Sequence, residues 1–129
     1  MVLLDEVTAC DGERITCRVT LRPDGLFAEE GRVPAVVAIE LMAQAVAAYA
    51  GLRAHAAGRP VRIGYLLGTR EMTLAVGHLD VGDELLVVAE HLFGGEQLGS
   101  FRCAVSRSGA AVAAATLNVY QAGDGEEPP

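Results

Sequence analysis

The fold is decided by residues 33–50, which read VPAVVAIELMAQAVAAYA. The run is apolar on every face of a helix except at Glu40 and Gln44, so we expect a long helix that other elements enclose. Pro34 suits the first helical turn, where its missing N–H would be unpaired anyway. The Gly-Arg-Pro at 58–60 is a typical helix exit. The pattern therefore predicts one long central helix.

Glu40 is the carboxylate within this apolar run. Burying an unpaired carboxylate costs roughly several kcal/mol, or raises its pKa until it protonates. We expect Glu40 to be buried and either satisfied locally or used in chemistry. Gln44 lies four residues on, on the same helical face, and is the natural local partner. The residues alone leave both interpretations open.

Strand patterns flank the helix on both sides. Asp11-Gly12 is a turn signal, and residues 14–21 alternate apolar with polar as a half-buried strand does. After the helix, strand-like runs follow, separated by Gly-containing turns such as Val81-Gly82-Asp83. These runs are residues 61–67, 71–76, 84–93, 98–106 and 110–121.

The order of elements predicts an α+β fold. A flat sheet cannot cover a helix that is apolar all round, so we expect a curved antiparallel sheet wrapped around the helix. A strand edge and part of the helix would stay exposed, which predicts a dimer. The single domain is expected over residues 1–122, followed by an acidic, Pro-rich, disordered tail at 123–129.

The composition excludes several function classes. The chain has 129 residues and a net charge of -7, which fits one domain and lacks the basic footprint of a nucleic-acid binder. The cysteines form no CxxC pair and no Cys/His cluster, so we expect no disulfide framework, no metal and no cofactor. They are Cys10, Cys17 and Cys103.

The expected location is the cytoplasm. Residues 1–4 run straight into Asp5 and Glu6, which is not the pattern of a signal peptide. Unpaired cysteines fit a reducing compartment. The helix approaches the ~20 residues that a bilayer span needs. Glu40, Gln44 and the flanking strands favour a core helix instead, so no membrane association is expected.

Four stretches resemble, in consistent order, the β-hydroxyacyl-[acyl carrier protein] dehydratases, which have the hotdog fold. More narrowly, residues 32–35 and 63–70 resemble a divergent branch of this family that is encoded with aryl-polyene gene clusters. The four stretches are LLDEV at 3–7 with the turn at 11–12, PAV at 34–36, ELMAQ at 40–44 and VGD at 81–83.

The resemblance implies a site and its partners. Glu40 would be the catalytic acid, Gln44 would orient it, and the amides of Ala35 and Val36 would bind the thioester carbonyl. The substrate would be a 3-hydroxyacyl thioester of acyl carrier protein or coenzyme A. The assembly would be a homodimer or larger hotdog oligomer, or a heterodimer with a homologous dehydratase. Candidate acyl-tunnel residues, which could equally be simple core, are Leu26, Phe27, Tyr65, Leu66 and Leu67.

Two positions depart from the family pattern. Leu26 stands where the family has a catalytic histidine, and Ala35 stands where it has glycine. Both changes fall at the expected site, so the base that removes the C2 proton has no evident candidate in the upstream loop. Glu29 and Glu30 in that loop are expected to be solvated charges.

The histidines and arginines of the chain have ordinary structural interpretations. We expect His78 on the surface near a turn, His91 on the outer face of the sheet and His55 at the helix end, where it caps carbonyls. An acidic carrier protein would need a local basic patch. The candidates for that patch, each of which could equally be a solubilising side chain, are Arg53, Arg59, Arg62 and Arg70.

Three functions remain open from the sequence. The first is a dehydratase with a modified base. The second is a non-catalytic hotdog subunit that pairs with a histidine-bearing homologue. The third is an acyl thioesterase, in which a helix carboxylate activates water.

Overall fold

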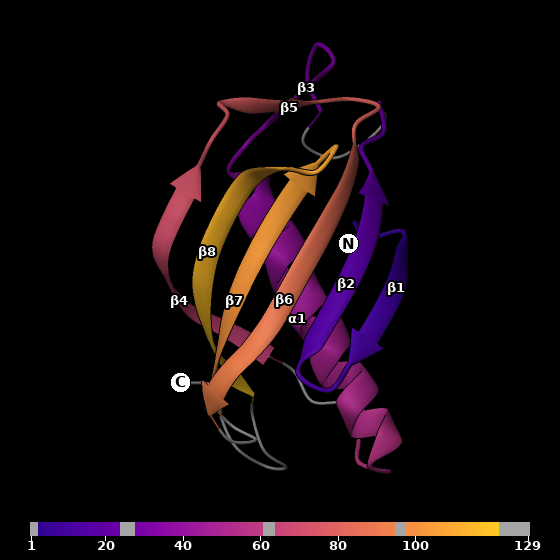
Figure 1. Ribbon diagram of the computed structural model, residues 1–129, viewed down its shortest axis with the longest axis vertical. Helices are drawn as coiled ribbons and strands as arrows, with labels where there is room; N and C mark the ends of the chain where they lie inside the picture. Colours follow the sequence, from indigo (N-terminus) through magenta and orange to yellow (C-terminus); the bar gives the residue numbers. More distant parts are fainter. Residues whose placement is uncertain (1–2, 24–27, 61–63, 95–97, 122–129) are drawn as a thin grey trace.

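The computed structural model describes residues 3–23, 28–60, 64–94 and 98–121, with Tyr65 and Gln121 described by their backbone. Eight strands and one helix make up this part of the chain (Figure 1). In order they are β1 (Glu6–Asp11), β2 (Arg14–Thr20), β3 (Arg32–Pro34), α1 (Val37–Ala56), β4 (Gly64–Leu74), β5 (His78–Asp80), β6 (Glu84–Gly94), β7 (Leu98–Arg107) and β8 (Ala110–Gln121).

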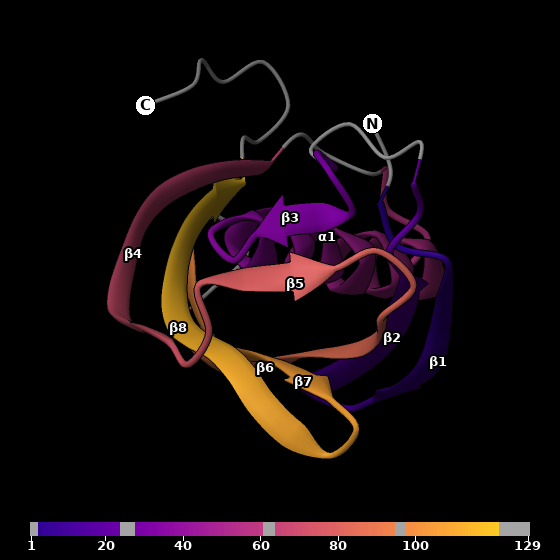
Figure 2. The same cartoon turned by 90° about the horizontal axis from the view of Figure 1, so that it is seen from above.

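A curved antiparallel sheet wraps around one long helix, as the sequence predicts. The sheet has six strands in the order β1-β2-β6-β7-β8-β4, and every neighbouring pair is antiparallel. Figures 1 and 2 show α1 lying in the hollow of this sheet. A second, two-stranded sheet of β3 and β5 lies across the start of the helix (Figure 2).

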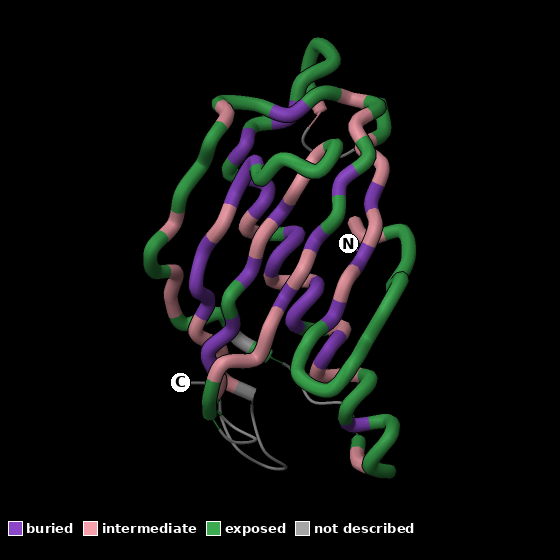
Figure 3. The backbone as a smooth tube through the Cα atoms, viewed as in Figure 1, coloured by how far each residue is buried: buried purple, intermediate pink, exposed green. Residues whose placement is uncertain are grey.

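The core forms between one stripe of α1 and the inner face of the sheet. The buried helix positions recur at spacings of three and four, which places them on one side of the helix. The strands show alternating burial: in β6, Leu85, Val87 and Ala89 are buried between less buried neighbours (Figure 3). The buried residues of α1 are Val37, Ala38, Leu41, Met42, Ala45, Val46, Tyr49 and Ala54.

The other face of α1 is uncovered in the single chain, which agrees with the expectation that part of the helix stays exposed. Val36 is 56% exposed, and Ala47 and Leu52 are exposed as well. By length and composition alone α1 could cross a membrane, but its buried stripe packs against the sheet in the domain core. A sequence that is apolar all round does not say which surface covers each face.

The helix begins at Val37, later than the predicted Pro34. Pro34 instead ends β3 and pairs with His78 of β5. Proline is tolerated at the end of an edge strand because its missing N–H removes no ladder hydrogen bond there. The two short strands were not predicted, because three residues carry too little alternation to be recognised.

Strand β4 is one continuous edge strand, and it is irregular. The two predicted runs at 61–67 and 71–76 join into it, although residues 61–63 lie outside the described part. Its pairing with β8 shifts register between Leu66 and Gly68 and again between Arg70 and Thr73. In the described structure β4 pairs with β8 alone, so its other edge is free to add a strand.

The predicted tail at 123–129 lies outside the described residues, as do Leu26, Phe27 and Arg62. The side chain of Tyr65 is likewise outside the description. Strands β6, β7 and β8 and the turn at Val81-Gly82-Asp83 agree with the prediction to within a residue or two.

Candidate functional site

Glu40 lies in the first turn of α1 and is exposed in the single chain. At 3.6 residues per turn, its position is opposite the buried stripe that contains Leu41 and Met42. The expectation of a buried carboxylate is therefore wrong at the level of one chain. The apolar residues around Glu40 in the sequence point to the sheet, while Glu40 itself points away from it.

Gln44 holds the Glu40 carboxylate, as expected from the spacing. Its Nε2 donates to Glu40 Oε1 at 3.2 Å. Its Oε1 accepts a hydrogen bond from the backbone N–H of Leu3 at 2.7 Å. Because a backbone N–H can only donate, the amide oxygen must face Leu3 and the NH2 group must face Glu40. The orientation of the amide is therefore determined by its two partners.

The start of α1 offers a hydrogen-bond donor beside Glu40. No side chain caps the helix at Val36, so the first amides depend on other partners. The Ala35 N–H donates to Gly77 O at 3.2 Å, which occupies one of the two expected donors. The Val36 N–H has no acceptor among the described residues. A free amide at a helix N-terminus, with the helix dipole behind it, suits a carbonyl oxygen that gains negative charge.

The β3–β5 sheet supports this end of the helix. His78 pairs with Pro34 through the backbone, and its Nε2 lies 3.6 Å from Asp80 Oδ1. The imidazole is on the surface beside a turn, as predicted. Asp83 locks the turn that follows β5, because its Oδ2 accepts hydrogen bonds from the Asp80 N–H at 2.9 Å and from Arg107 Nη1 at 2.8 Å.

The charge of Asp83 is stabilised by these contacts. Burial alone would raise the pKa of its carboxyl group. The backbone hydrogen bond at Asp80 and the Arg107 guanidinium outweigh that effect, and the pKa lies below its usual value. The turn between β5 and β6 is therefore built around an ionised carboxylate.

His91 lies on the inner face of the sheet, so its prediction was wrong. Its ring centroid is 5.1 Å from that of Phe101 and 6.2 Å from that of Tyr49. The inward residues of β6 have odd numbers, and His91 continues that series. Tyr49 lies about 13 Å beyond Glu40 along the helix, at 1.5 Å per residue. His91 is therefore part of a different region from the candidate acid.

The remaining predicted residues are spread over the structure. Leu66 and Leu67 are exposed on the edge strand β4. His55 is exposed in the last turn of α1, and no side-chain hydrogen bond to a carbonyl is among its described contacts. Arg53 donates to Gly12 O at 3.0 Å, which gives it a structural role. Arg70 is exposed on β4, and Glu29 and Glu30 are exposed loop charges, as expected.

Two contacts were missed by sequence reasoning. One is the hydrogen bond from the Leu3 N–H to Gln44, and the other joins Tyr49 and Arg53 to the carbonyl of Gly12. Each contact joins residues about forty positions apart in the sequence, so no local sequence pattern predicts it. Within the described residues, no group of three or more His, Cys, Asp or Glu side chains is placed to hold a metal ion.

Comparison with known proteins places this geometry in a family context. The sequence model of the ApeP-like family, described as ApeP dehydratase, matches residues 1–128. The structure described as the dehydratase heterocomplex ApeI:P from Xenorhabdus doucetiae is similar, with 31% sequence identity and a TM-score of 0.89. The match covers 95% of this chain and 84% of that chain.

More distant structures share the fold alone. A hypothetical thioesterase with coenzyme A from Streptococcus pneumoniae is 16% identical with a TM-score of 0.68, over 92% of this chain and 88% of that one. The TT0310 protein from Thermus thermophilus is 19% identical with a TM-score of 0.67, over 91% of both chains. No curated protein matches the chain in sequence.

Proposed function

The chain belongs to the ApeP-like dehydratase family, and on that basis we propose that it dehydrates 3-hydroxyacyl thioesters at a site that a second hotdog subunit completes. Glu40 is the acid of this site. The observation that carries the proposal is the group at the start of α1: an exposed carboxylate held by Gln44, about one helical turn from the Val36 amide, which has no acceptor among the described residues. The family membership supplies the reaction class, and the geometry supports the roles.

The roles follow from the bonds that change. A base removes the C2 proton, the C3–O bond breaks, a C2–C3 double bond forms, and water leaves with a proton from the acid. Protonated Glu40 donates that proton to the departing hydroxyl. The Val36 N–H donates a hydrogen bond to the thioester oxygen, where negative charge develops as the C2 proton is lost. Among the described residues, this chain has no group beside Glu40 that could act as the base.

Among the described residues, no histidine contacts Glu40. Leu26 occupies the family's histidine position in the sequence. A second subunit bearing that histidine would provide the base from across the interface. The similar solved structure is described as a dehydratase heterocomplex, ApeI:P, which supports pairing with a different chain over pairing with an identical one.

Two uncovered surfaces support association with another hotdog subunit. The exposed face of α1 carries Val36 and Leu52, and the free edge of β4 carries Leu66, Leu67 and Leu74. Such apolar surfaces are typical of a subunit interface. Covering the α1 face would also remove water from around Glu40, which strengthens its hydrogen bonds to Gln44 and to a bound substrate.

The sequence alternatives define the other outcomes. A non-catalytic subunit would give shape to its partner and need no Glu40. A thioesterase would release a free thiol from the same substrates. The acyl carrier is either acyl carrier protein or coenzyme A, and the cytoplasm is the compartment that three free cysteines fit.

The test measures turnover of a 3-hydroxyacyl thioester by mass spectrometry. The purified chain is assayed alone and with a histidine-bearing homologue, on the acyl carrier protein form and on the coenzyme A form of the substrate. We expect an enoyl product from the mixture, and its loss on Glu40→Gln. Glu13→Gln, an exposed glutamate at the β1–β2 turn, is the matched control and should retain full turnover.

The other outcomes are informative. A mixture that stays fully active with Glu40→Gln makes the chain a structural subunit. Release of free thiol without an enoyl product identifies a thioesterase. Full activity of the chain alone would mean that it contains its own base.

A further inference from the structure

We propose that the N-terminal segment of the chain positions the Glu40 carboxylate, acting through Gln44. The inference deepens the proposed function and rests on it for the catalytic role of Glu40. Its starting observation is a continuous path of hydrogen bonds. The Leu3 N–H donates to Gln44 Oε1 at 2.7 Å, and Gln44 Nε2 donates to Glu40 Oε1 at 3.2 Å.

The path matters because Glu40 is exposed. An exposed glutamate has several rotamers of similar energy, and ordering such a side chain costs free energy of up to about 2 kcal/mol. The short contact with the Leu3 N–H fixes the amide oxygen, and the rigid amide plane then aims the NH2 group at Glu40. The backbone of residue 3 therefore determines the geometry of a carboxylate that lies on a different element, the helix.

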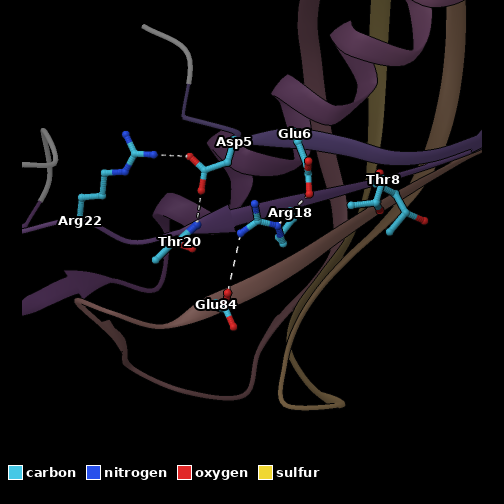
Figure 4. Close-up of polar contacts among 8 residues, drawn as sticks. Asp5, Glu6, Thr8, Arg18, Thr20, Arg22 and Glu84 are labelled. Atoms are coloured by element: carbon cyan, nitrogen blue, oxygen red, sulfur yellow. Dashed lines mark hydrogen bonds and ion pairs between the residues drawn. The ribbon is translucent and has the colours of Figure 1, made fainter.

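The N-terminal segment is itself anchored at Asp5. The Asp5 side chain is only 17% exposed. Its Oδ2 accepts a hydrogen bond from the Thr20 N–H at 2.7 Å, and its Oδ1 accepts one from Arg22 Nη2 at 2.9 Å. The Asp5 N–H donates to Arg18 O at 2.9 Å. Figure 4 shows the Asp5 carboxylate between Thr20 and Arg22.

Apolar packing completes the anchor. Leu3 and Leu4 are partly buried and pack against the hydrophobic core. The Asp5 carboxylate holds the segment at one point, and the two leucines hold it along the surface of the core. With both in place, the Leu3 N–H has a defined direction toward Gln44. Asp5 and Leu3 are thus positioning residues, because they act through another side chain.

Glu6, the residue after Asp5 and the first of β1, provides a matched control. It also pairs with an arginine, at 3.0 Å from Arg18 Nε, and Figure 4 shows it beside Asp5. Its side chain is 55% exposed, and exposed pairs of this kind contribute little to stability. None of the described hydrogen bonds or ion pairs of the Glu6 side chain connects it to Gln44. Removing the Glu6 charge tests for a general effect of altering this strand.

The first part of the test measures structure by NMR and does not require the protein to be catalytically active. We would record the exchange of the Leu3 amide hydrogen and the ¹³C shift of the Glu40 carboxyl carbon by NMR, using protein with any tag at the C-terminus. In the wild type we expect the Leu3 amide to exchange slowly. Gln44→Met removes its acceptor, so exchange should become about tenfold faster or more, since protection depends on that hydrogen bond. Gln44→Glu retains an acceptor oxygen and should keep the protection.

The anchor is tested in the same experiment. Asp5→Asn should speed exchange of the Leu3 amide and shift the Glu40 carboxyl signal in the same direction as Gln44→Met does. Glu6→Gln should change neither. If the Leu3 amide exchanges freely in the wild type, or if Asp5→Asn moves the Glu40 signal no more than Glu6→Gln does, the inference is wrong.

The kinetic part uses the active assembly. A misplaced catalytic group loses rate while substrate binding is retained, so we expect kcat to fall about tenfold or more in Gln44→Met and Gln44→Glu, with KM unchanged. Asp5→Asn should lower kcat in the same sense, and Glu6→Gln should not. Equal kcat in all four variants would overturn the positioning role.

The two proposals fail in different ways. If Glu40→Gln retains full turnover, the proposed function is wrong, whatever the NMR shows. If Glu40→Gln abolishes turnover while Asp5→Asn and Gln44→Met leave kcat and the Glu40 signal unchanged, the function stands and the positioning inference falls.

Discussion

The two halves of α1 differ in their polar and aromatic contacts. In the second half, Tyr49 and Arg53 both donate to Gly12 O, at 3.1 and 3.0 Å, and the Tyr49 ring packs edge-on against Phe101. In the first turn no side chain caps the helix, and Glu40 is exposed. Both halves bury apolar residues against the sheet. The second, which we call the anchored half, adds aromatic packing and hydrogen bonds to Gly12, and the first, which we call the open half, presents Glu40 on its outer face.

Along this one helix, the contacts that add most to stability and the groups proposed to act on a substrate therefore lie in different places. Buried aromatic contacts contribute strongly to the stability of the native state. Exposed polar groups at a helix start contribute little to stability, but they can bind and protonate a substrate. Core packing along both halves, with the additional contacts of the anchored half, holds α1 in place, and the open half uses that rigidity to place Glu40. Substitutions in the two halves should have different consequences.

Glu40→Gln is expected to have the largest effect, on the open half. It removes the acid while conserving the shape of the side chain, so turnover of the active assembly should fall by about 10²–10⁴-fold. The unfolding midpoint should stay within the error of the wild type, because the side chain is exposed. Enzyme assays and thermal unfolding on the same sample check both statements. A large loss of stability would show that Glu40 belongs to the structural half.

Tyr49→Ala should have the reverse effect. Truncating a buried aromatic side chain leaves a cavity and typically costs about 3–5 kcal/mol, and here the ring's contacts with Arg53 and Phe101 are lost as well. Urea unfolding measures this loss. In the folded fraction, kcat of the active assembly should be close to that of the wild type. A kcat that falls as far as in Glu40→Gln would mean that the two halves are not independent.

Tyr49→Phe separates the hydroxyl group from the ring. The ring packing remains, and the hydrogen bond to Gly12 O is lost, so the expected cost is about 1 kcal/mol. Burial raises the pKa of the Tyr49 hydroxyl, so it stays protonated and able to donate well above neutral pH. Urea unfolding of the Ala and Phe variants separates the stability that the ring packing contributes from the stability that the hydroxyl hydrogen bond contributes. Equal losses in the two variants would assign the whole effect to the hydroxyl.

The acid sensitivity of the β5–β6 turn should be the smallest effect. The pKa of Asp83 in the folded chain lies below its usual value of 3.8. The stability that its ionised form contributes is therefore present above pH 3.8 and is lost as the pH falls through the lower folded value. Asp83→Asn should reduce the loss of thermal stability between about pH 5 and pH 2. Asp11→Asn, an exposed aspartate on β1, is the control, and an equal reduction there would contradict the role of Asp83.

The sequence predicts the frame of the molecule well. The apolar helix and the long strands β6, β7 and β8 are strongly patterned, and the bounds of these strands were predicted to within a residue or two. The short strands β3 and β5 carry no such pattern, and Pro34 was assigned to the helix because a proline fits either place. His91 was assigned to the wrong face because a strand's inward parity depends on its exact register.

The site was predicted in part. The pairing of Gln44 with Glu40 follows from helical spacing and was foreseen. The exposure of Glu40 was not, because a sequence that is apolar on all faces does not distinguish a face covered by its own sheet from one left for a partner. The contact of Leu3 with Gln44 joins residues far apart in the chain, and only the folded structure brings them together.

In the proposed assembly, the irregular edge strand β4 would affect how subunits recognise one another. Its two register shifts interrupt the even spacing of backbone donors and acceptors, and Glu71 has a positive φ of 52° at the second of them. A strand that joins this edge can form a full ladder only if its own groups match the interrupted spacing. Discrimination between related subunits can therefore reside in the backbone path of β4, independently of the charges on its surface.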